Sequence, residues 1–131
     1  SMPFTKLGLC PEFASSLLLP HIVGYQRAAE KLMLGEEFSA QEACEMGFVN
    51  KVLPAVELLA FAQAQADKLV TLPTSSLRAT KRLMKGKQMA AIEAKIKEES
   101  VHFSEMLVSK EAKEAFTAFF EKRKPDFTKF K

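Results

Sequence analysis

The sequence lacks the residues that usually mark a metal cluster, a disulfide framework or a nucleic-acid-binding surface. Its 131 residues include no tryptophan, one tyrosine, two cysteines and two histidines. Cys10 and Cys44 are far apart, show no CxxC spacing and have no histidine beside them, which argues against a disulfide framework and a metal site. With one tyrosine, no tryptophan and no recognition motif, we expect no nucleic-acid partner.

Long apolar runs are also absent. A membrane-spanning helix needs about 20 apolar residues in succession, whereas the apolar stretches 17–20 and 52–62 are short or interrupted. The first residues contain no basic segment followed by an apolar stretch, so nothing there resembles a secretory signal. We therefore expect no membrane partner, and the isolated cysteines favour a cytoplasmic location.

What the sequence does contain is typical of one globular domain. Hydrophobic residues make up 47% of the chain and charged residues 27%, as in ordinary soluble proteins. The net charge of +3 arises late in the chain, at Lys122, Arg123, Lys124, Lys129 and Lys131, whereas acidic residues are interspersed elsewhere. Such a basic run usually lies at the solvated C-terminal end of a helix.

Proline and glycine divide the first part of the chain into short helices. Pro11 suits the first position of a helix, because its missing N–H would have no partner there. It predicts a helix over residues 12–19, which Pro20 ends. A second helix follows Gly24 and ends at Gly35, which supplies a C-cap.

A third helix and a strand are expected next. Ser39 and Glu42 match the capping box, in which the hydroxyl and the carboxylate each accept a hydrogen bond from an otherwise unpaired backbone N–H. Gly47 then ends this helix after about two turns. The segment 48–53 alternates imperfectly and carries β-branched residues, which predicts a short strand closed by Pro54.

Beyond residue 54 the sequence predicts helices only. Apolar residues recur at helical spacing in four successive segments. These residues are Leu58, Ala62, Ala66 and Leu69; Leu77 and Met84; Met89, Ile92, Ile96, Phe103 and Leu107; and Ala112, Ala115, Phe116, Phe119 and Phe120. The connections between the segments are short, which favours helices packed back on one another or on a neighbouring subunit. The predicted fold class is therefore mainly α.

The order of motifs carries more information than composition. Residues 3–12 read Pro-Phe-Thr-Lys-Leu-Gly-Leu-Cys-Pro-Glu, and further blocks follow at 28–35, 39–49 and 119–127. This succession resembles the crotonase (enoyl-CoA hydratase/isomerase) superfamily over nearly the whole chain. The resemblance implies the C-terminal helical part of a crotonase-like α/β spiral fold with one short strand. The N-terminal spiral of β-β-α turns would lie before Ser1.

The resemblance also implies two regions within the chain. Residues 1–53 would be the end of the crotonase core, with the catalytic-helix region and the short strand. Residues 54–131 would form the C-terminal helical region for coenzyme A binding and trimer formation. Relatives usually form trimers or pairs of trimers, so we expect a homotrimer or a hexamer. Helix faces that normally meet the other half of the fold should expose apolar surface.

Enolate chemistry on an acyl-CoA thioester is the activity that the resemblance implies. Two backbone N–H groups stabilise the negative charge that develops on the thioester oxygen, and one or two carboxylates move the proton. In the family these N–H groups come from the N-terminal half, so the isolated chain is expected to be inactive. Coenzyme A is part of the substrate, and no separate cofactor or metal is expected.

The placement of carboxylates favours one reaction of the family. Hydratases carry their second glutamate where Phe4 stands here, whereas peroxisomal-type 3-enoyl-CoA isomerases place their base further along, where Pro11 and Glu12 stand. The resemblance therefore predicts that Glu12 is the base of a 3-enoyl to 2-enoyl-CoA isomerase of fatty acid oxidation. A purely structural interpretation is that an acid directly after a proline stabilises the first turn of a helix.

Two other functions stay open, and two further residues are candidates for substrate binding. A hydratase-like lyase activity would use a displaced base, and a non-catalytic module would keep only the coenzyme A pocket or the trimer surface. Phe119 and Lys122 fall where relatives contact the adenine and the phosphate of coenzyme A, which suits a ring and a cation. The structural alternative makes Phe119 a core residue and Lys122 a solvated helix end.

Overall fold

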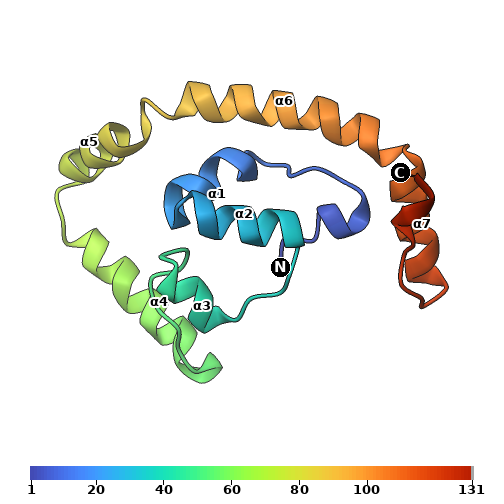
Figure 1. Ribbon diagram of the computed structural model, residues 1–131. Helices are drawn as coiled ribbons and strands as arrows, with labels where there is room; N and C mark the ends of the chain where they lie inside the picture. The colour runs from blue at the N-terminus through green and yellow to red at the C-terminus, as the bar shows by residue number, and fades with distance from the viewer. Residues whose placement is uncertain (131) are drawn as a thin grey trace.

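The computed structural model describes residues 1–130 as a series of helices joined by short connections (Figure 1). The elements in chain order are η1 (Thr5–Leu7), α1 (Ser15–Val23), α2 (Tyr25–Leu34), α3 (Ala40–Glu45), α4 (Ala55–Val70), α5 (Thr74–Lys85), α6 (Met89–Leu107), α7 (Lys110–Phe120) and η2 (Phe127–Phe130). None of the described helices is long and apolar enough to pass through a membrane.

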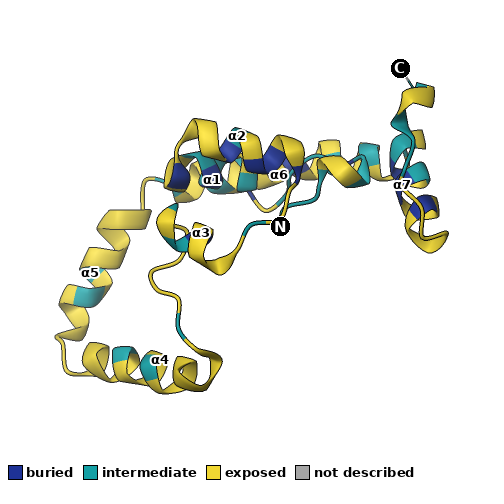
Figure 2. Cartoon of the chain, turned by 60° about the horizontal axis from the view of Figure 1, so that its bottom comes forward, coloured by how far each residue is buried: buried dark blue, intermediate teal, exposed yellow. Residues whose placement is uncertain are grey.

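Helices α1 and α2 form the centre of the molecule. They pack side by side, and α6 runs along the outer side of α1 (Figure 1). Helices α3, α4 and α5 lead away from this centre before the chain returns to the start of α6 (Figure 2). Helix α7 lies at the other end of α6, where it contacts η1. The segment between η1 and α1 is therefore next to α6.

A small apolar core holds α1 to α2. It consists of buried aliphatic side chains from both helices: Leu19, Val23, Ala28 and Leu32. Three partly buried side chains pack against this core: Met2, Phe4 and Met46. Burying a leucine or valine side chain contributes about 1.5–3 kcal/mol, so these few contacts supply much of the stability of this part of the chain.

A close backbone approach at Gly8 joins η1 to α7. Gly8 has a φ of 67°, and a Cβ on it would lie 2.8 Å from both the Ala112 nitrogen and the Glu111 carbonyl carbon. The buried residues of α7 are also small, namely Ala112, Ala115 and Ala118. A side chain at position 8 would meet both a strained conformation and a clash with backbone, which only glycine avoids.

The predicted helix over residues 12–19 is misplaced. Helix α1 begins at Ser15 and continues through Pro20 to Val23. The proline removes one helical hydrogen bond. The helix nevertheless continues, because its last turn brings Val23 into the core and Gly24 donates a hydrogen bond to the Pro20 carbonyl at 3.0 Å. Tertiary packing has outweighed the local stop signal.

The predicted strand at residues 48–53 is wrong. A strand needs a neighbouring strand to complete its backbone hydrogen bonds, and residues 1–130 contain none. Instead, the N–H groups of Phe48 and Val49 both donate to the Ala43 carbonyl, at 2.8 and 3.2 Å. The chain thus turns back on the end of α3 and continues as an irregular connection to α4.

Other local predictions are confirmed. The Ser39 hydroxyl accepts a hydrogen bond from the Glu42 N–H at 3.1 Å, and the Glu42 carboxylate accepts one from the Ser39 N–H at 2.7 Å, which completes the capping box. Gly35 ends α2 with a left-handed φ of 60°. The four helices expected beyond residue 54 are α4 to α7, so the mainly α fold class is confirmed.

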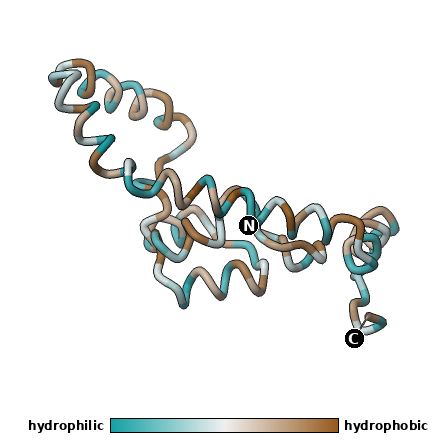
Figure 3. Tube along the Cα trace, turned by 90° about the horizontal axis from the view of Figure 1, so that it is seen from above, coloured by the Kyte–Doolittle hydropathy of each residue, from teal (hydrophilic) through white to brown (hydrophobic). Residues whose placement is uncertain are grey.

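Helices α4 and α5 have no buried residue. Figure 2 shows most of both helices as exposed, and Figure 3 shows hydrophobic and hydrophilic positions mixed along them. The most exposed large apolar side chains of the two helices are 80–90% exposed: Val56, Leu59, Val70 and Leu83. The expected exposure of apolar helix faces is therefore confirmed in this part of the chain.

Candidate functional site

Glu12 lies in the turn that leads from η1 into α1. The residue is half-buried, and its carbonyl accepts hydrogen bonds from the Ser15 N–H at 3.1 Å and the Ser15 hydroxyl at 2.6 Å. Since α1 begins at Ser15 and has no acid in its first turn, Glu12 does not stabilise that turn in the usual way. Within residues 1–130, no hydrogen bond or ion pair engages the Glu12 carboxylate.

The two residues after Glu12 have an unusual backbone conformation. Phe13 and Ala14 have φ angles of 57° and 56°, in the left-handed region. This conformation costs about 1–2 kcal/mol for each residue other than glycine. Phe13 is 78% exposed, whereas Ala14 is completely buried. Such a conformation persists only where surrounding contacts hold it, so the contacts of Ala14 matter most.

Glu99 of α6 supplies these contacts. It is only 6% exposed, and its carboxylate accepts hydrogen bonds from the Ala14 N–H at 2.5 Å and the Ser16 N–H at 3.0 Å. The Ser16 hydroxyl donates a third hydrogen bond to the same carboxylate at 2.5 Å. Ala14 is the N-cap of α1 and has no side-chain acceptor for the first N–H groups of the helix. Glu99 therefore caps α1 from a different helix.

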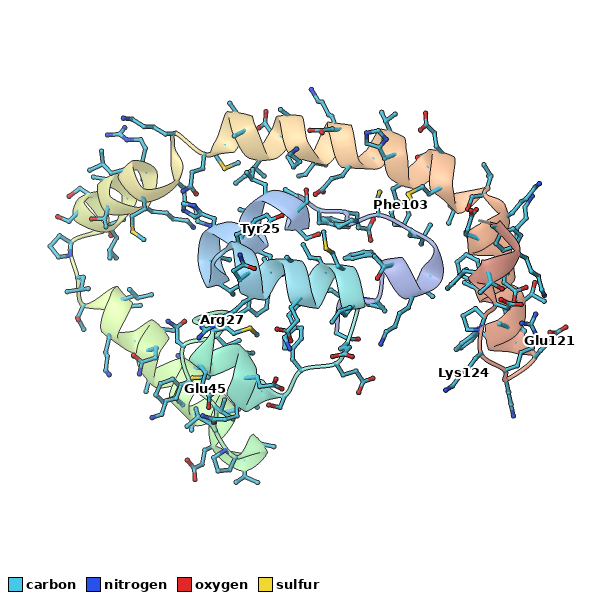
Figure 4. All side chains as sticks on the ribbon, in the orientation of Figure 1. Tyr25, Arg27, Glu45, Phe103, Glu121 and Lys124 are labelled. Carbon is cyan, nitrogen blue, oxygen red and sulfur yellow. The ribbon has the colours of Figure 1, made fainter. Side chains whose placement is uncertain are left out.

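Sequence reasoning did not single out Glu99. The sequence feature that could have identified it is an acid on an apolar helix face. Ile92, Ile96 and Phe103 recur at helical spacing, and position 99 falls among them. Figure 4 shows Phe103 on the side of α6 that faces the segment before α1. A glutamate on such a face is rarely buried without polar partners, so it predicts a partner of its own.

A neutral thiol lies beside this segment. The Cys10 Sγ is 3.9 Å from the Glu99 carbonyl oxygen. Burial raises the pKa of the Cys10 thiol, and the nearby negative charges of Glu99 and Glu12 raise it further, against the opposing effect of a backbone hydrogen bond. The thiol therefore stays protonated at neutral pH and is a poor nucleophile. No cluster of acidic, histidine and cysteine side chains within residues 1–130 could hold a metal ion.

An apolar hollow is lined by residues of α1 and of the start of α6. Leu17 and Leu18 line it from α1, and Ile92 lines it from α6. At its edge, a ring nitrogen of His21 lies 3.2 Å from the Gln88 side-chain amide nitrogen. Hydrocarbon and a few polar groups are the usual lining of a small-molecule site. The first residue that lines this hollow, Leu17, follows Glu12 by five positions in the sequence.

The other two candidates lie on a different part of the molecule, at the end of α7. Phe119 is 74% exposed and makes an edge-to-face contact with Phe120, with ring centroids 5.8 Å apart. Within residues 1–130 it is therefore not part of a buried core. Lys122 follows α7 with a left-handed φ of 54°, and its N–H donates to the Phe119 carbonyl. No hydrogen bond or ion pair in the described chain links either residue to Glu12.

Arg123 anchors the chain after α7. Its guanidinium pairs with Glu114 at 2.5 Å and with Glu121 at 2.6 Å. The hydrogen bond from Arg123, together with one from the Asp126 N–H, lowers the pKa of Glu114 to about 2. Lys122 takes no part in this network and has no ion pair within residues 1–130, so its ammonium group is available to another anion.

Comparison with known proteins identifies the family. The family model described as enoyl-CoA hydratase/isomerase matches residues 1–130. The chain belongs to this family. It is 34% identical over 127 residues to a probable enoyl-CoA hydratase of Bacillus subtilis, which covers 96% of this chain and 49% of that protein. It is 32% identical over 127 residues to the 1,2-epoxyphenylacetyl-CoA isomerase of Escherichia coli, covering 97% and 48%.

Solved structures of enoyl-CoA hydratase/isomerase proteins share this arrangement of helices. An enoyl-CoA hydratase/isomerase from Pseudoalteromonas atlantica matches with a TM-score of 0.89 at 42% identity, over 96% of this chain and 51% of that one. An enoyl-CoA hydratase from Mycobacterium avium matches with a TM-score of 0.86 at 32% identity, over 95% and 51%. The chain thus spans about half the length of its relatives. Both the crotonase superfamily and the mainly helical part of its fold are confirmed.

Proposed function

We propose that the intact protein is an enoyl-CoA isomerase that moves a double bond from C3 to C2, with Glu12 as its only catalytic carboxylate in this chain. The observation that carries the proposal is the contrast between Glu12 and Phe4. The Glu12 carboxylate has no partner within residues 1–130, whereas Phe4 packs against the apolar core. The position where the family resemblance places the second glutamate of a hydratase therefore holds no ionisable group here.

One carboxylate is sufficient for this reaction. The Glu12 carboxylate removes a proton from C2 of the 3-enoyl thioester, and the electron pair spreads over C2, C3, C4 and the thioester carbonyl as a dienolate. The protonated Glu12 then returns that proton to C4, which leaves the double bond between C2 and C3. Backbone N–H groups from outside this chain would stabilise the thioester oxygen while it carries negative charge. No atom is gained or lost.

Relatives named as enzymes of coenzyme A thioesters support an acyl-CoA thioester as the substrate class. Phe119 offers an exposed ring for the adenine, and Lys122 offers an ammonium group without an ion pair for a phosphate. The hollow beside Leu17 and Leu18 suits an acyl chain. We propose further that the intact protein assembles as a homotrimer or hexamer and requires no cofactor beyond the coenzyme A of its substrate.

A hydratase is the second candidate, because several relatives carry that name, including the short-chain-enoyl-CoA hydratase of Clostridium acetobutylicum. Incubating the intact protein with a 3-enoyl-CoA and, separately, with a 2-enoyl-CoA distinguishes the two. We expect a shifted double bond from the first substrate and no hydration of the second. Hydration would support the hydratase, and neither product would support a non-catalytic module that binds coenzyme A.

Replacement of the proposed base tests the assignment directly. Glu12→Gln should lower the isomerisation rate on the order of 10²–10⁴-fold, the usual contribution of a general base. Binding of coenzyme A and the melting temperature should stay unchanged, because the carboxylate has no partner within residues 1–130. Glu36→Gln, an exposed acid outside this segment, is the matched control. Full turnover by Glu12→Gln would refute Glu12 as the base.

A further inference from the structure

We infer that Glu99 is a positioning residue for the proposed reaction: it fixes the segment that carries Glu12 by capping α1 from α6. The inference rests on the proposed function of Glu12. Glu99 does not itself meet the substrate, since both of its carboxylate oxygens accept hydrogen bonds from the start of α1 and the residue is buried. Its effect on catalysis is therefore exerted through the backbone of Ala14 and Ser16.

The start of α1 has no capping group of its own. The first N–H groups of any helix lack acceptors within the helix, and a serine, threonine, aspartate or asparagine at the N-cap usually provides one. Alanine stands at this position, and no acid occurs in the first turn. The Glu99 carboxylate, 85 positions away in sequence, provides the missing hydrogen-bond acceptor. A negative charge at this end of the helix is also favoured by the helix dipole.

The same hydrogen bonds hold the unusual turn after Glu12. Ala14 is buried with a left-handed φ, its N–H donates to Glu99, and its carbonyl accepts from the N–H groups of Leu17 and Leu18. Both polar backbone groups of Ala14, its N–H and its carbonyl, are thus hydrogen-bonded. Only Phe13 separates this fixed point from Glu12. The position of the Glu12 carboxylate therefore depends on the hydrogen bond that the Glu99 carboxylate accepts from Ala14, two residues after Glu12.

Of the adjacent acids Glu98 and Glu99 on α6, only Glu99 accepts hydrogen bonds from the start of α1 in the described chain. Both acids line a hollow that Cys10, Pro11 and Ser16 also line. Glu98 pairs with Lys95 at 2.6 Å on the exposed face of α6 and has no hydrogen bond to α1 in the described chain. Glu98 therefore provides a neighbouring acid of the same type on the same helix, suited as a control.

The test compares Glu99→Gln, Glu99→Asp and Glu98→Gln in the intact protein. A glutamine at position 99 keeps only one acceptor oxygen. Its NH₂ group would face an N–H group of Ala14 or Ser16, from which it cannot accept a hydrogen bond. We expect the kcat for 3-enoyl-CoA isomerisation to fall roughly 10- to 100-fold in Glu99→Gln, as for other small misplacements of a catalytic group, with KM changed less than about 3-fold. Glu99→Asp keeps a carboxylate and should recover part of the loss. Glu98→Gln should retain the wild-type kcat.

A loss of stability alone would give a different pattern. Val23→Ala shortens a buried side chain at the opposite end of α1 and should lower the melting temperature without a selective loss of kcat. An equal fall of kcat in Val23→Ala would overturn the inference, as would a wild-type kcat in Glu99→Gln.

Amide hydrogen exchange at Ala14 and Ser16 provides a readout that needs no activity. Exchange there should accelerate in Glu99→Gln and stay slow in Glu98→Gln. If Glu12→Gln retains turnover, the proposed base is wrong, and with it the positioning role, even where the exchange data show the cap. If Glu12→Gln is inactive while Glu99→Gln has normal kcat, only the positioning role fails.

Discussion

The α1–α2 pair and the α4–α5 pair are both helical, yet only the first is packed. Leu19 of α1 is 4% exposed, whereas Leu59 of α4 is 83% exposed. The start of α1 depends on Glu99 of another helix, while α4 and α5 have no buried residue at all. Helix formation in α4 and α5 therefore follows from local sequence, and the bounds of α1 follow from tertiary contacts. The proposed base lies in the region that tertiary contacts shape.

The largest effect on stability is expected from a matched pair of leucine truncations. Leu19→Ala should lower the free energy of unfolding of the 131-residue chain by about 2–5 kcal/mol, the usual cost of a cavity in a core. Leu59→Ala should change it by less than about 0.5 kcal/mol, because the side chain is already exposed. Urea unfolding of both variants measures the difference. Equal losses of unfolding free energy in the two variants would show that Leu59 is buried in solution, and would contradict the difference in packing between α1 and α4.

Two glycine substitutions sharpen the comparison at the level of the backbone. Gly8→Ala places a Cβ within 2.8 Å of backbone atoms of α7 and should cost about 2–4 kcal/mol, from the left-handed conformation and overpacking together. Gly47→Ala has a similar φ of 76° but open space around it, so only the conformational cost of about 1–2 kcal/mol applies. Thermal unfolding of the two variants should rank them in this order. A smaller loss for Gly8→Ala would contradict the close approach of η1 to α7.

The smallest effect is expected where charges rather than packing hold a segment. Arg123 lowers the pKa of Glu114 to about 2, below the value of about 4.3 in an unfolded chain. The pair therefore stabilises the fold fully at pH values above the pKa of Glu114 in the unfolded chain. This contribution is lost as the pH falls towards the pKa of about 2 in the folded chain. Glu114→Gln should lower the melting temperature at pH 6 and match the wild type near pH 2. A difference that does not change with pH would exclude ionisation of Glu114 as its cause.

Much of the fold could be predicted from the sequence because the signals were local. The capping box at Ser39 and the C-cap at Gly35 involve residues within one turn, and the periodic apolar positions of α4 to α7 required no partner to be recognised. The strand at residues 48–53 failed for the opposite reason, since a strand exists only with a neighbour. Pro20 was misjudged as a stop because packing of Val23 in the core extends α1 beyond it.

The candidate site was predicted only in part for the same reason. Glu12 stood out through an ordered motif that resembles a known family. Glu99 did not, because its partners at the start of α1 lie far away in sequence, and no local pattern of α6 specifies that contact. The interpretation of Glu12 as a helix-stabilising acid could be rejected only once the structure showed that α1 begins at Ser15.

Isotope transfer by the intact protein tests the central claim most directly. A 3-enoyl-CoA carrying deuterium at C2 is converted by the enzyme, and the product is analysed by mass spectrometry and proton NMR. If Glu12 alone carries the proton, part of the deuterium appears at C4 of the 2-enoyl product, and Glu12→Gln forms no such product. A 3-hydroxyacyl-CoA product, or isomerisation that continues in Glu12→Gln, would contradict the account.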